Sequence, residues 1–145
     1  LKGFIKEIIE EMQPIAQKTN NTLEFIQQRD IRVYADRIQL KRVIKNLIQN
    51  AISYGEPNFP IEVSIGEIPQ YIVIKVKDYG AGISKTDIDK IFNKYYSAAK
   101  KFRKIGTGLG LYLALQIIKS HNGELSVESE EGNFTEFTIN LHYGE

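Results

Sequence analysis

The 145-residue chain contains no cysteine or tryptophan and only one methionine. The absence of cysteine excludes a disulfide scaffold, a thiol nucleophile and a cysteine-ligated zinc site. The 19 basic and 18 acidic side chains leave a net charge of +1, which argues against a generally basic nucleic-acid-binding protein. No apolar run approaches the roughly 20 residues that span a bilayer, and no signal-peptide pattern opens the chain. The composition therefore predicts a soluble, intracellular-type domain. We expect this domain to be cytoplasmic and without direct membrane contact, and a membrane-bound parent protein stays compatible with the sequence.

The length and the apolar fraction of 42% are typical of one domain with its own core. A chain of this size buries roughly 68–70% of its unfolded surface, so it needs neither a metal nor a disulfide to fold. We therefore expect a single domain over residues 1–145. Because the sequence begins with Leu1 rather than methionine, we also expect it to be part of a longer protein.

Apolar residues recur at helical spacing in three segments, which are residues 1–18, 36–54 and 109–120. Pro14 should bend or interrupt the first of these helices, because proline lacks the backbone N–H that the helix needs. Asp36 is suited to cap the start of the second helix, and Gly55 is suited to a left-handed cap at its end.

Alternating apolar and polar residues predict strands between and after these helices, over residues 22–27, 31–34, 61–65, 71–77, 124–128 and 134–141. Residues 85–92 predict a short helix. Residues 93–107 are polar, basic and aromatic without a clear period, so we expect a mobile loop there, most mobile over 94–107. The layout predicts an α+β fold with helices packed on one face of a largely antiparallel sheet.

Two asparagines of the second helix, Asn46 and Asn50, are four residues apart and lie on one face at the edge of its apolar stripe. Half-buried amides need a hydrogen-bonding or metal partner. One interpretation is a pair of surface amides that are solvated or bonded to a neighbouring loop. The other is that an amide oxygen binds a hard cation such as Mg²⁺, which takes few protein ligands and keeps phosphate oxygens and waters.

Two glycine-containing motifs follow. In the first, Asp78-Tyr79-Gly80-Ala81-Gly82-Ile83 comes directly after a predicted strand, which is typical of a simple turn or of a loop that lets a flat ligand approach. In the second, Gly106-Thr107-Gly108-Leu109-Gly110-Leu111 opens a helix, where backbone N–H groups favour phosphate. This second motif has neither the dinucleotide-binding nor the Walker spacing, and a plain hinge is the alternative.

Taken in order, these motifs and the Ile91-Phe92 pair before the predicted loop resemble the ATP-binding catalytic domain of bacterial sensor histidine kinases. The resemblance extends over essentially the whole chain, as far as the strand that contains Phe137. This family shares its fold with the gyrase, MutL and heat-shock chaperone ATPases. It implies a two-layer α/β sandwich of the Bergerat type, in which about three helices cover one face of a mixed, mostly antiparallel sheet. ATP is expected between the helices and a flexible lid.

The resemblance implies a role for each matching residue. Asn50 is expected to be the Mg²⁺ ligand, and Asn46 a second polar contact near the triphosphate, which makes these two the expected catalytic residues. Asp78 would accept a hydrogen bond from the adenine amino group, Tyr54 would pack beside the nucleotide, and Thr135 would lie near the adenine. The loop residues expected to line the nucleotide are Gly80, Gly82, Ile83, Gly106, Thr107, Gly108, Leu109 and Gly110. The first two glycines would clear space for the ring, and the later three would present N–H groups to phosphate.

Three positions depart from the family pattern. Ser53 stands where a lysine is common before the tyrosine of the first motif, so one phosphate-directed charge is missing. Phe134 replaces the second glycine of a late Gly-x-Gly-Thr pattern, and Tyr79 occupies a position that usually holds a smaller residue. These departures leave the expected metal ligand and adenine acceptor in place, and bear on nucleotide affinity and lid geometry.

The identity of residue 46 bears on the reaction. In hydrolysing relatives this position resembles a glutamate that activates water, and an amide such as that of Asn46 cannot act as a general base at neutral pH. We therefore expect phosphoryl transfer to a protein rather than hydrolysis. Phosphoryl transfer depends mainly on positioning and charge neutralisation. Some lid cations could contribute that charge, although each taken singly is better explained as a solvated surface group: Lys94, Lys100, Lys101, Arg103 and Lys104.

The phosphoacceptor is expected outside this chain. His121 and His142 are the only histidines, neither resembles the family's acceptor histidine on a helical hairpin, and both are predicted to be structural or surface groups. We therefore expect a domain that binds Mg-ATP and phosphorylates a histidine of a separate dimerisation domain, with a response regulator as the indirect partner. The alternatives are an anti-sigma-factor-type serine kinase and a nucleotide-gated interaction module that transfers nothing. Aromatic residues among the lid charges could suggest single-stranded nucleic acid, which the near-neutral chain disfavours.

Overall fold

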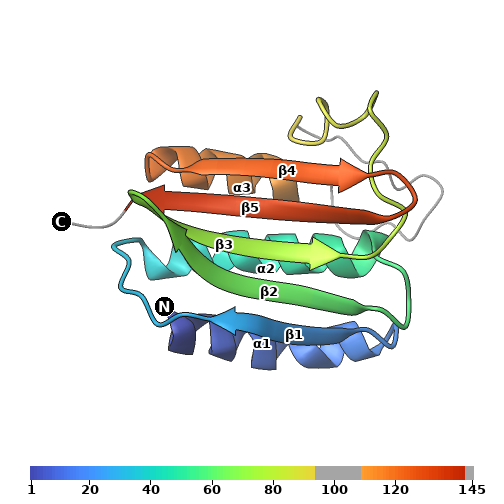
Figure 1. The fold of residues 1–145 in the computed structure, drawn as a ribbon, viewed down its shortest axis with the longest axis horizontal. Coiled ribbons are helices and arrows are strands. Elements are labelled where there is room, and N and C mark those ends of the chain that lie inside the picture. The colour runs from blue at the N-terminus through green and yellow to red at the C-terminus, as the bar shows by residue number, and fades with distance from the viewer. Residues whose placement is uncertain (94–108, 143–145) are drawn as a thin grey trace.

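The computed structural model describes residues 1–93 and 109–142 and shows one sheet with helices behind it (Figure 1). In chain order the elements are α1 (Lys2–Gln17), β1 (Thr22–Gln28), α2 (Arg37–Tyr54), β2 (Pro60–Ile68), β3 (Tyr71–Asp78), α3 (Gly110–Ser120), β4 (Glu124–Glu130) and β5 (Phe134–His142). The five-stranded sheet has the order β1-β2-β3-β5-β4. The β1–β2 pair is parallel and the other pairs are antiparallel. The predicted α+β sandwich with a mixed, mostly antiparallel sheet is confirmed.

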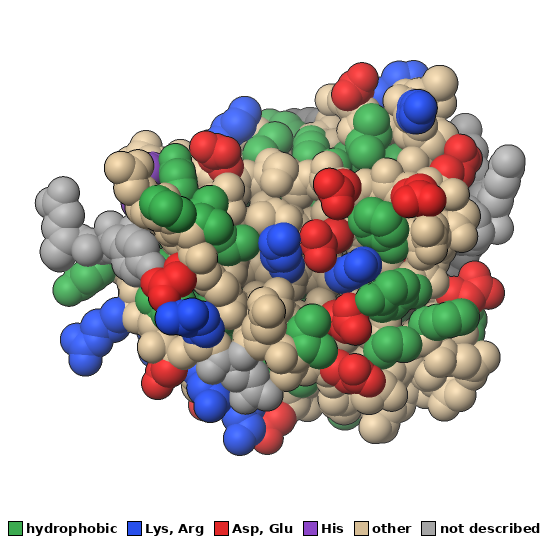
Figure 2. Space-filling view, viewed as in Figure 1, with side chains coloured by type: hydrophobic (Ala, Val, Ile, Leu, Met, Phe, Trp, Pro, Cys, Tyr) green, Lys and Arg blue, Asp and Glu red, His purple; other side chains and the backbone are tan. Residues whose placement is uncertain are grey.

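The core lies between the sheet and the helices because side chains alternate between the two faces of each strand. In β3, Ile72, Ile74 and Val76 are buried, whereas Lys75 and Lys77 lie on the other face. The neighbouring strands continue the apolar layer, since Ile74 is paired with Ile65 of β2 and Ile139 of β5. The opposite face of the sheet, which carries charged and aromatic side chains, is open to solvent and faces the viewer in Figure 2.

Helix α1 runs without interruption through Pro14, so the predicted interruption is wrong. Its buried face, which includes Ile5, Ile8 and Met12, packs on the sheet. The stabilisation from this burial exceeds the cost of the one backbone hydrogen bond that proline cannot donate. The neighbouring Gln13 also holds β1, because its side-chain amide donates to Leu23 O at 3.2 Å and accepts from Leu23 N–H at 2.9 Å.

Three local predictions are corrected. Residues 31–34 form an irregular connector instead of a strand, because Ile31 and Val33 pack against the core without a strand to pair with. Gly55 ends α2 in an extended conformation, with φ −73° and ψ 160°, not in the left-handed one. Residues 85–92 form a series of turns, joined mainly by bonds to the third residue back, such as Lys90 N–H to Asp87 O at 2.8 Å. The predicted N-cap is confirmed, since Asp36 accepts from the N–H groups of Ile38 and Gln39.

One buried amide, Asn21, joins the turn after α1 to the loop after α2. Its side chain is 1% exposed, donates to the carbonyls of Glu56 and Phe59 at 2.9 Å each, and accepts from the Thr19 hydroxyl. Because removal of the amide would leave buried polar groups without partners, we expect Asn21→Ala to lower the free energy of unfolding by about 3 kcal/mol.

Urea denaturation of the Asn21→Ala variant tests this expectation. The matched control is Asn133→Ala, in the exposed turn between β4 and β5, where we expect a change of less than about 0.5 kcal/mol. Equal stabilities of the two variants would contradict the structural role of Asn21.

Candidate functional site

The carboxyl group of Asp78 marks the end of β3. Asp78 is 3% exposed, is paired in register with Thr135 of β5, and its Oδ1 accepts from the Gly80 N–H at 3.0 Å. Burial raises the pKa of this carboxyl to about 7, and the bond from Gly80 opposes the rise only partly. The second oxygen, Oδ2, makes no hydrogen bond to any residue that the structure describes. A buried acceptor of this kind can recognise a single donor group of a ligand.

Two glycines bring the end of α2 against this carboxyl. A Cβ on Gly80 would lie 2.3 Å from Tyr54 O and 2.8 Å from the Gly55 Cα, and a Cβ on Gly55 would lie 2.5 Å from Ala51 O. The backbone of the loop therefore touches the backbone of the helix end, and both segments lie at the same end of the molecule (Figure 1). The predicted role of Gly80 in clearing space for a ring stays a prediction, whereas its contact with the Tyr54 carbonyl is a finding.

The rest of the loop is fastened to the last two strands through Ser129 of β4. The Ile83 N–H donates to Ser129 Oγ at 2.8 Å, and this hydroxyl donates to Phe134 O and lies 3.1 Å from Thr135 Oγ1. Gly82 has φ +73°, and a Cβ there would lie 2.4 Å from Glu130 O. Sequence reasoning missed Ser129. The available signal was a polar residue on the inward face of β4, where Leu125 and Val127 precede it at period 2.

The two asparagines of α2 differ in their surroundings. The Asn46 amide donates to Gly110 O at 3.2 Å and so connects α2 to the first turn of α3. Asn50, one helical turn further on, is half-buried and makes no hydrogen bond to the described part of the chain. Leu109 is the N-cap of α3, and among the described residues no side chain caps this end. Its backbone N–H groups are therefore suited to an anion. The asparagine pair of α2 and the glycine-containing motif that opens α3 therefore meet at the first turn of α3.

Part of the predicted site lies outside the described residues. Gly106, Thr107 and Gly108 belong to this part, as do the lid cations and the loop that we expect over 94–107. Tyr54 is half-buried at the end of α2, next to Gly80. The structure thus brings Tyr54 and Asp78 together through Gly55 and Gly80, and Asn50 and Asn46 lie one and two helical turns further back along α2.

Two departures from the family pattern meet on the open face of the sheet. The Lys77 ammonium lies 5.0 Å from the centroid of the Tyr79 ring and 4.7 Å from that of Phe134. The Tyr79 hydroxyl donates to Glu62 at 2.7 Å, and this hydrogen bond raises the pKa of Tyr79 to about 12. Both rings therefore lie on the opposite face of the sheet from Asp78. The third departure, Ser53, is buried and its hydroxyl donates to Gln49 O within α2.

Both histidines have structural contacts. His121 ends α3, contacts Ile117 O through Nδ1 at 2.9 Å, and accepts from the Asp36 N–H through Nε2 at 3.1 Å. His142 stacks on Tyr71 with ring centroids 4.6 Å apart. The helix-ending turn predicted at His121 is confirmed, with Asn122 at φ 57°.

The described residues contain no group of three or more histidine or acidic side chains that could hold a metal ion. A single amide oxygen such as that of Asn50 fits only a cation that takes most of its ligands from phosphate and water, as Mg²⁺ does. Among the described helices, none is long and apolar enough to cross a membrane.

Comparisons with known proteins show which proteins this chain resembles. The chain is 34% identical over 148 aligned residues to the sensor histidine kinase WalK of Bacillus subtilis, and 35% identical over 148 to histidine kinase P4 of Formosa agariphila. These alignments cover 98% and 97% of this chain but 24% and 11% of the relatives, so the chain spans at most a quarter of their length.

The structure is similar to the solved catalytic domain of histidine kinase ThkA, with a TM-score of 0.85, 28% identity, and coverage of 98% of this chain and 91% of the other. The family described as histidine kinase-, DNA gyrase B- and HSP90-like ATPase matches residues 35–145. Both Asp78 and the two asparagines fall within this match. The chain therefore belongs to the histidine kinase-, DNA gyrase B- and HSP90-like ATPase family.

Proposed function

We propose that this domain binds Mg-ATP at the end of the sandwich where β3 and α2 meet, and passes the γ-phosphoryl group to a histidine on a separate dimerisation domain. The single observation that carries the proposal is the buried carboxyl of Asp78, which has one oxygen on the Gly80 N–H and the other without a partner among the described residues. An adenine amino group supplies the donor that this second oxygen lacks. A carboxyl 3% exposed would otherwise be costly to keep there.

The triphosphate would extend from the adenine toward Asn50 and the start of α3. The Asn50 amide oxygen would hold the Mg²⁺, which supplies charge neutralisation at the phosphates when bound. The N-terminus of α3 would present backbone N–H groups to the phosphate oxygens. Asn46 would position this helix through its bond to Gly110 O, found at 3.2 Å.

Transfer is favoured over hydrolysis because, in the described part of the chain, the side chain beside the first residue of α3 is the amide of Asn46. Asn46 donates from its nitrogen to Gly110 O. An amide is too weak a base to remove a proton from water at neutral pH. The isolated domain should therefore hydrolyse ATP slowly, and the response regulator would receive its phosphoryl group from the dimerisation domain.

A single-turnover phosphotransfer assay tests this proposal. The domain is mixed with radiolabelled ATP, Mg²⁺ and the parent protein's dimerisation hairpin, and the label on the hairpin is followed over time. We expect acid-labile, alkali-stable label that Asn50→Ala reduces at least about 100-fold, because the loss of one metal contact in the transition state corresponds to about 2.7 kcal/mol. Gln49→Ala, one residue away on α2, is the matched control and should retain the transfer rate within about threefold.

Each other outcome contradicts a defined part of the proposal. Acid-stable label would indicate a serine or threonine acceptor, as in an anti-sigma-factor-type kinase. Nucleotide binding without any label would leave a nucleotide-gated interaction module. Rapid release of inorganic phosphate by the domain alone would contradict the role given to Asn46.

A further inference from the structure

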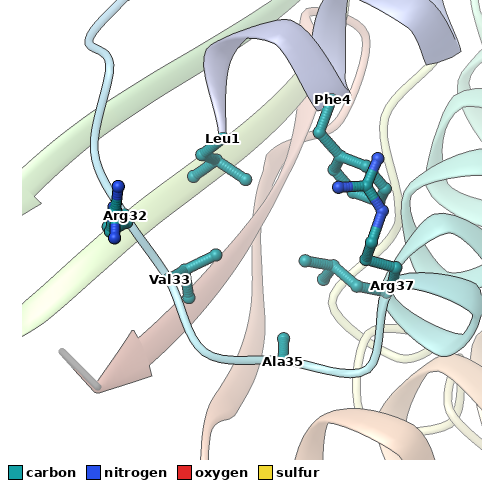
Figure 3. A pocket seen from close by; sticks show the side chains of 7 residues that line it. Leu1, Phe4, Arg32, Val33, Ala35 and Arg37 are labelled. Atoms are coloured by element: carbon teal, nitrogen blue, oxygen red, sulfur yellow. The ribbon is translucent and has the colours of Figure 1, made fainter. Parts of the chain in front are cut away.

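The N-terminal ends of α1 and α2 and the connector 29–36 lie at the end of the molecule opposite the C-terminal end of β3 (Figure 1). Residues of these segments line two neighbouring hollows. The first has a volume of about 220 Å³ and the second about 190 Å³. Phe4 and Arg37 line both hollows. The Arg37 guanidinium carbon lies 5.2 Å from the centroid of the Phe4 ring. Because this stacked pair belongs to the walls of both hollows, it forms the divide between them, and Figure 3 shows the pair at the side of the first hollow.

The walls of both hollows are mainly apolar. Leu1, Val33 and Ala35 surround the first (Figure 3), together with Leu40. Ile8 and Ile38 line the second. Ile38 is 77% exposed although it is a large apolar residue in the first turn of α2.

The charge around the hollows is mainly positive. Arg32, Arg37 and Lys41 line them, against a single acidic residue, Glu7. Lys41 is paired with Glu11 at 3.1 Å, whereas neither Arg32 nor Arg37 forms an ion pair with any carboxylate of the described residues. An arginine without a carboxylate beside an apolar hollow is complementary to a ligand that combines an apolar group with an acidic one.

The size of the hollows favours a protein segment over a small molecule. Sites for small molecules usually have about 300–1,000 Å³, which exceeds either hollow, and the Phe4–Arg37 divide separates the two. Each hollow can take one apolar side chain, and a helix with anchors on one face can place two side chains in neighbouring hollows.

We propose that this surface, made of the two hollows and the Phe4–Arg37 pair between them, binds an acidic amphipathic helix of a partner protein. Two apolar side chains of that helix would enter the hollows, and its carboxylates would pair with Arg32 and Arg37. The surface lies at the opposite end of the sheet from the end of β3 (Figure 1), which is the residue Asp78, so this binding is independent of the nucleotide.

A panel of synthetic 15-residue helical peptides tests this proposal by NMR titration into the ¹⁵N-labelled 145-residue chain. Each peptide carries two leucines three, four or seven residues apart, with either glutamates or lysines at the flanking positions. We expect at least one glutamate peptide to bind with saturation below 1 mM and to shift the amide resonances of Phe4 and residues 33–38. Its lysine counterpart should bind at least tenfold more weakly.

Two charge reversals on α2 identify the site. Arg37→Glu should lower the affinity for the glutamate peptide at least tenfold. This variant is expected to fold, because an acidic residue in the first turn of a helix interacts favourably with the helix dipole. Arg42→Glu, an exposed arginine of the same helix that lines neither hollow, should leave peptide affinity within twofold. Neither variant should change the affinity for ATP.

Four results would overturn the proposal. These are no saturable binding by any peptide, equal binding of the glutamate and lysine peptides, or shifts that gather outside the surface. The fourth is concentration-dependent shifts of the same amides without peptide, which would identify a second copy of the chain as the occupant.

Discussion

Asp78→Asn is expected to abolish tight ATP binding while it makes the protein more stable at neutral pH. The asparagine Oδ1 would keep the bond from the Gly80 N–H, now 3.0 Å, so the amide nitrogen would stand where Oδ2 is. There a donor would face the adenine amino group, which is also a donor. We expect the dissociation constant for ATP to rise at least about 100-fold, equivalent to about 2.7 kcal/mol, as measured by titration calorimetry.

The gain in stability follows from the pKa of Asp78. Burial raises this pKa from 3.8 to about 7 in the folded state, whereas the unfolded chain releases the proton near its ordinary value. Between these pH values the unfolded chain binds fewer protons than the folded one, so the contribution of Asp78 to the free energy of unfolding falls as pH rises from about 4 to about 7. Above pH 7 this contribution is lost completely. The size of the pKa shift corresponds to a loss of up to about 4 kcal/mol in the free energy of unfolding.

Urea denaturation at pH 4 and pH 8 measures this effect. Asp78→Asn should exceed the native protein in stability at pH 8, by about 2–4 kcal/mol, and by much less at pH 4. The control is Asp89→Asn, at an exposed carboxyl in the turns of residues 85–92. For this variant we expect the free energy of unfolding to change by less than about 0.5 kcal/mol and ATP binding to stay unchanged. An Asp78→Asn variant less stable than the native protein at pH 8 would contradict the desolvation of this carboxyl.

Gly80→Ala is expected to damage both folding and nucleotide binding. The added methyl group would lie 2.3 Å from Tyr54 O and 2.8 Å from the Gly55 Cα. Both neighbours are backbone atoms, so no side-chain rotation can relieve the clash. The end of α2 must then move away from the loop after β3, which we expect to lower the free energy of unfolding by about 3 kcal/mol. The same movement separates Asn50 from Asp78, so ATP affinity should fall at least about tenfold, equivalent to about 1.4 kcal/mol.

Gly66→Ala provides the matched comparison, because a Cβ on Gly66 of β2 would meet nothing within 4 Å. We expect its stability to stay within about 1 kcal/mol of the native value and its ATP affinity to stay unchanged. Denaturation and calorimetry of the two variants side by side make the test. Similar stabilities for the two alanine variants would show that the contact between Gly80 and Tyr54 is dispensable.

The departures Tyr79 and Phe134 illustrate what a linear motif leaves open. Each was placed in a nucleotide motif by its position in the sequence, but alternation along β3 and β5 turns both rings to the open face of the sheet. There they enclose Lys77. Tyr79 directly follows Asp78 in the chain, yet the two side chains lie on opposite faces of the sheet, because neighbouring residues of a strand point to opposite faces.

Features that depend on local periodicity and local chemistry could be predicted from the order of the amino acids. The apolar stripe and Asp36 cap of α2, the alternating strands, and the motif that places Asp78 directly after β3 are of this kind, because their residues interact within a few positions of one another. The fold class and the family also followed from such patterns taken in order.

Features that depend on residues far apart in the chain could not be predicted in this way, because they arise from packing between elements. Gly55 is extended because it packs against the loop at Gly80, α1 continues through Pro14 because its buried face holds it on the sheet, and residues 31–34 stay irregular because no strand lies beside them. Ser129 binds the loop at Ile83, 46 residues away. No local pattern encodes such contacts, since their energy exists only once the sheet and helices have assembled.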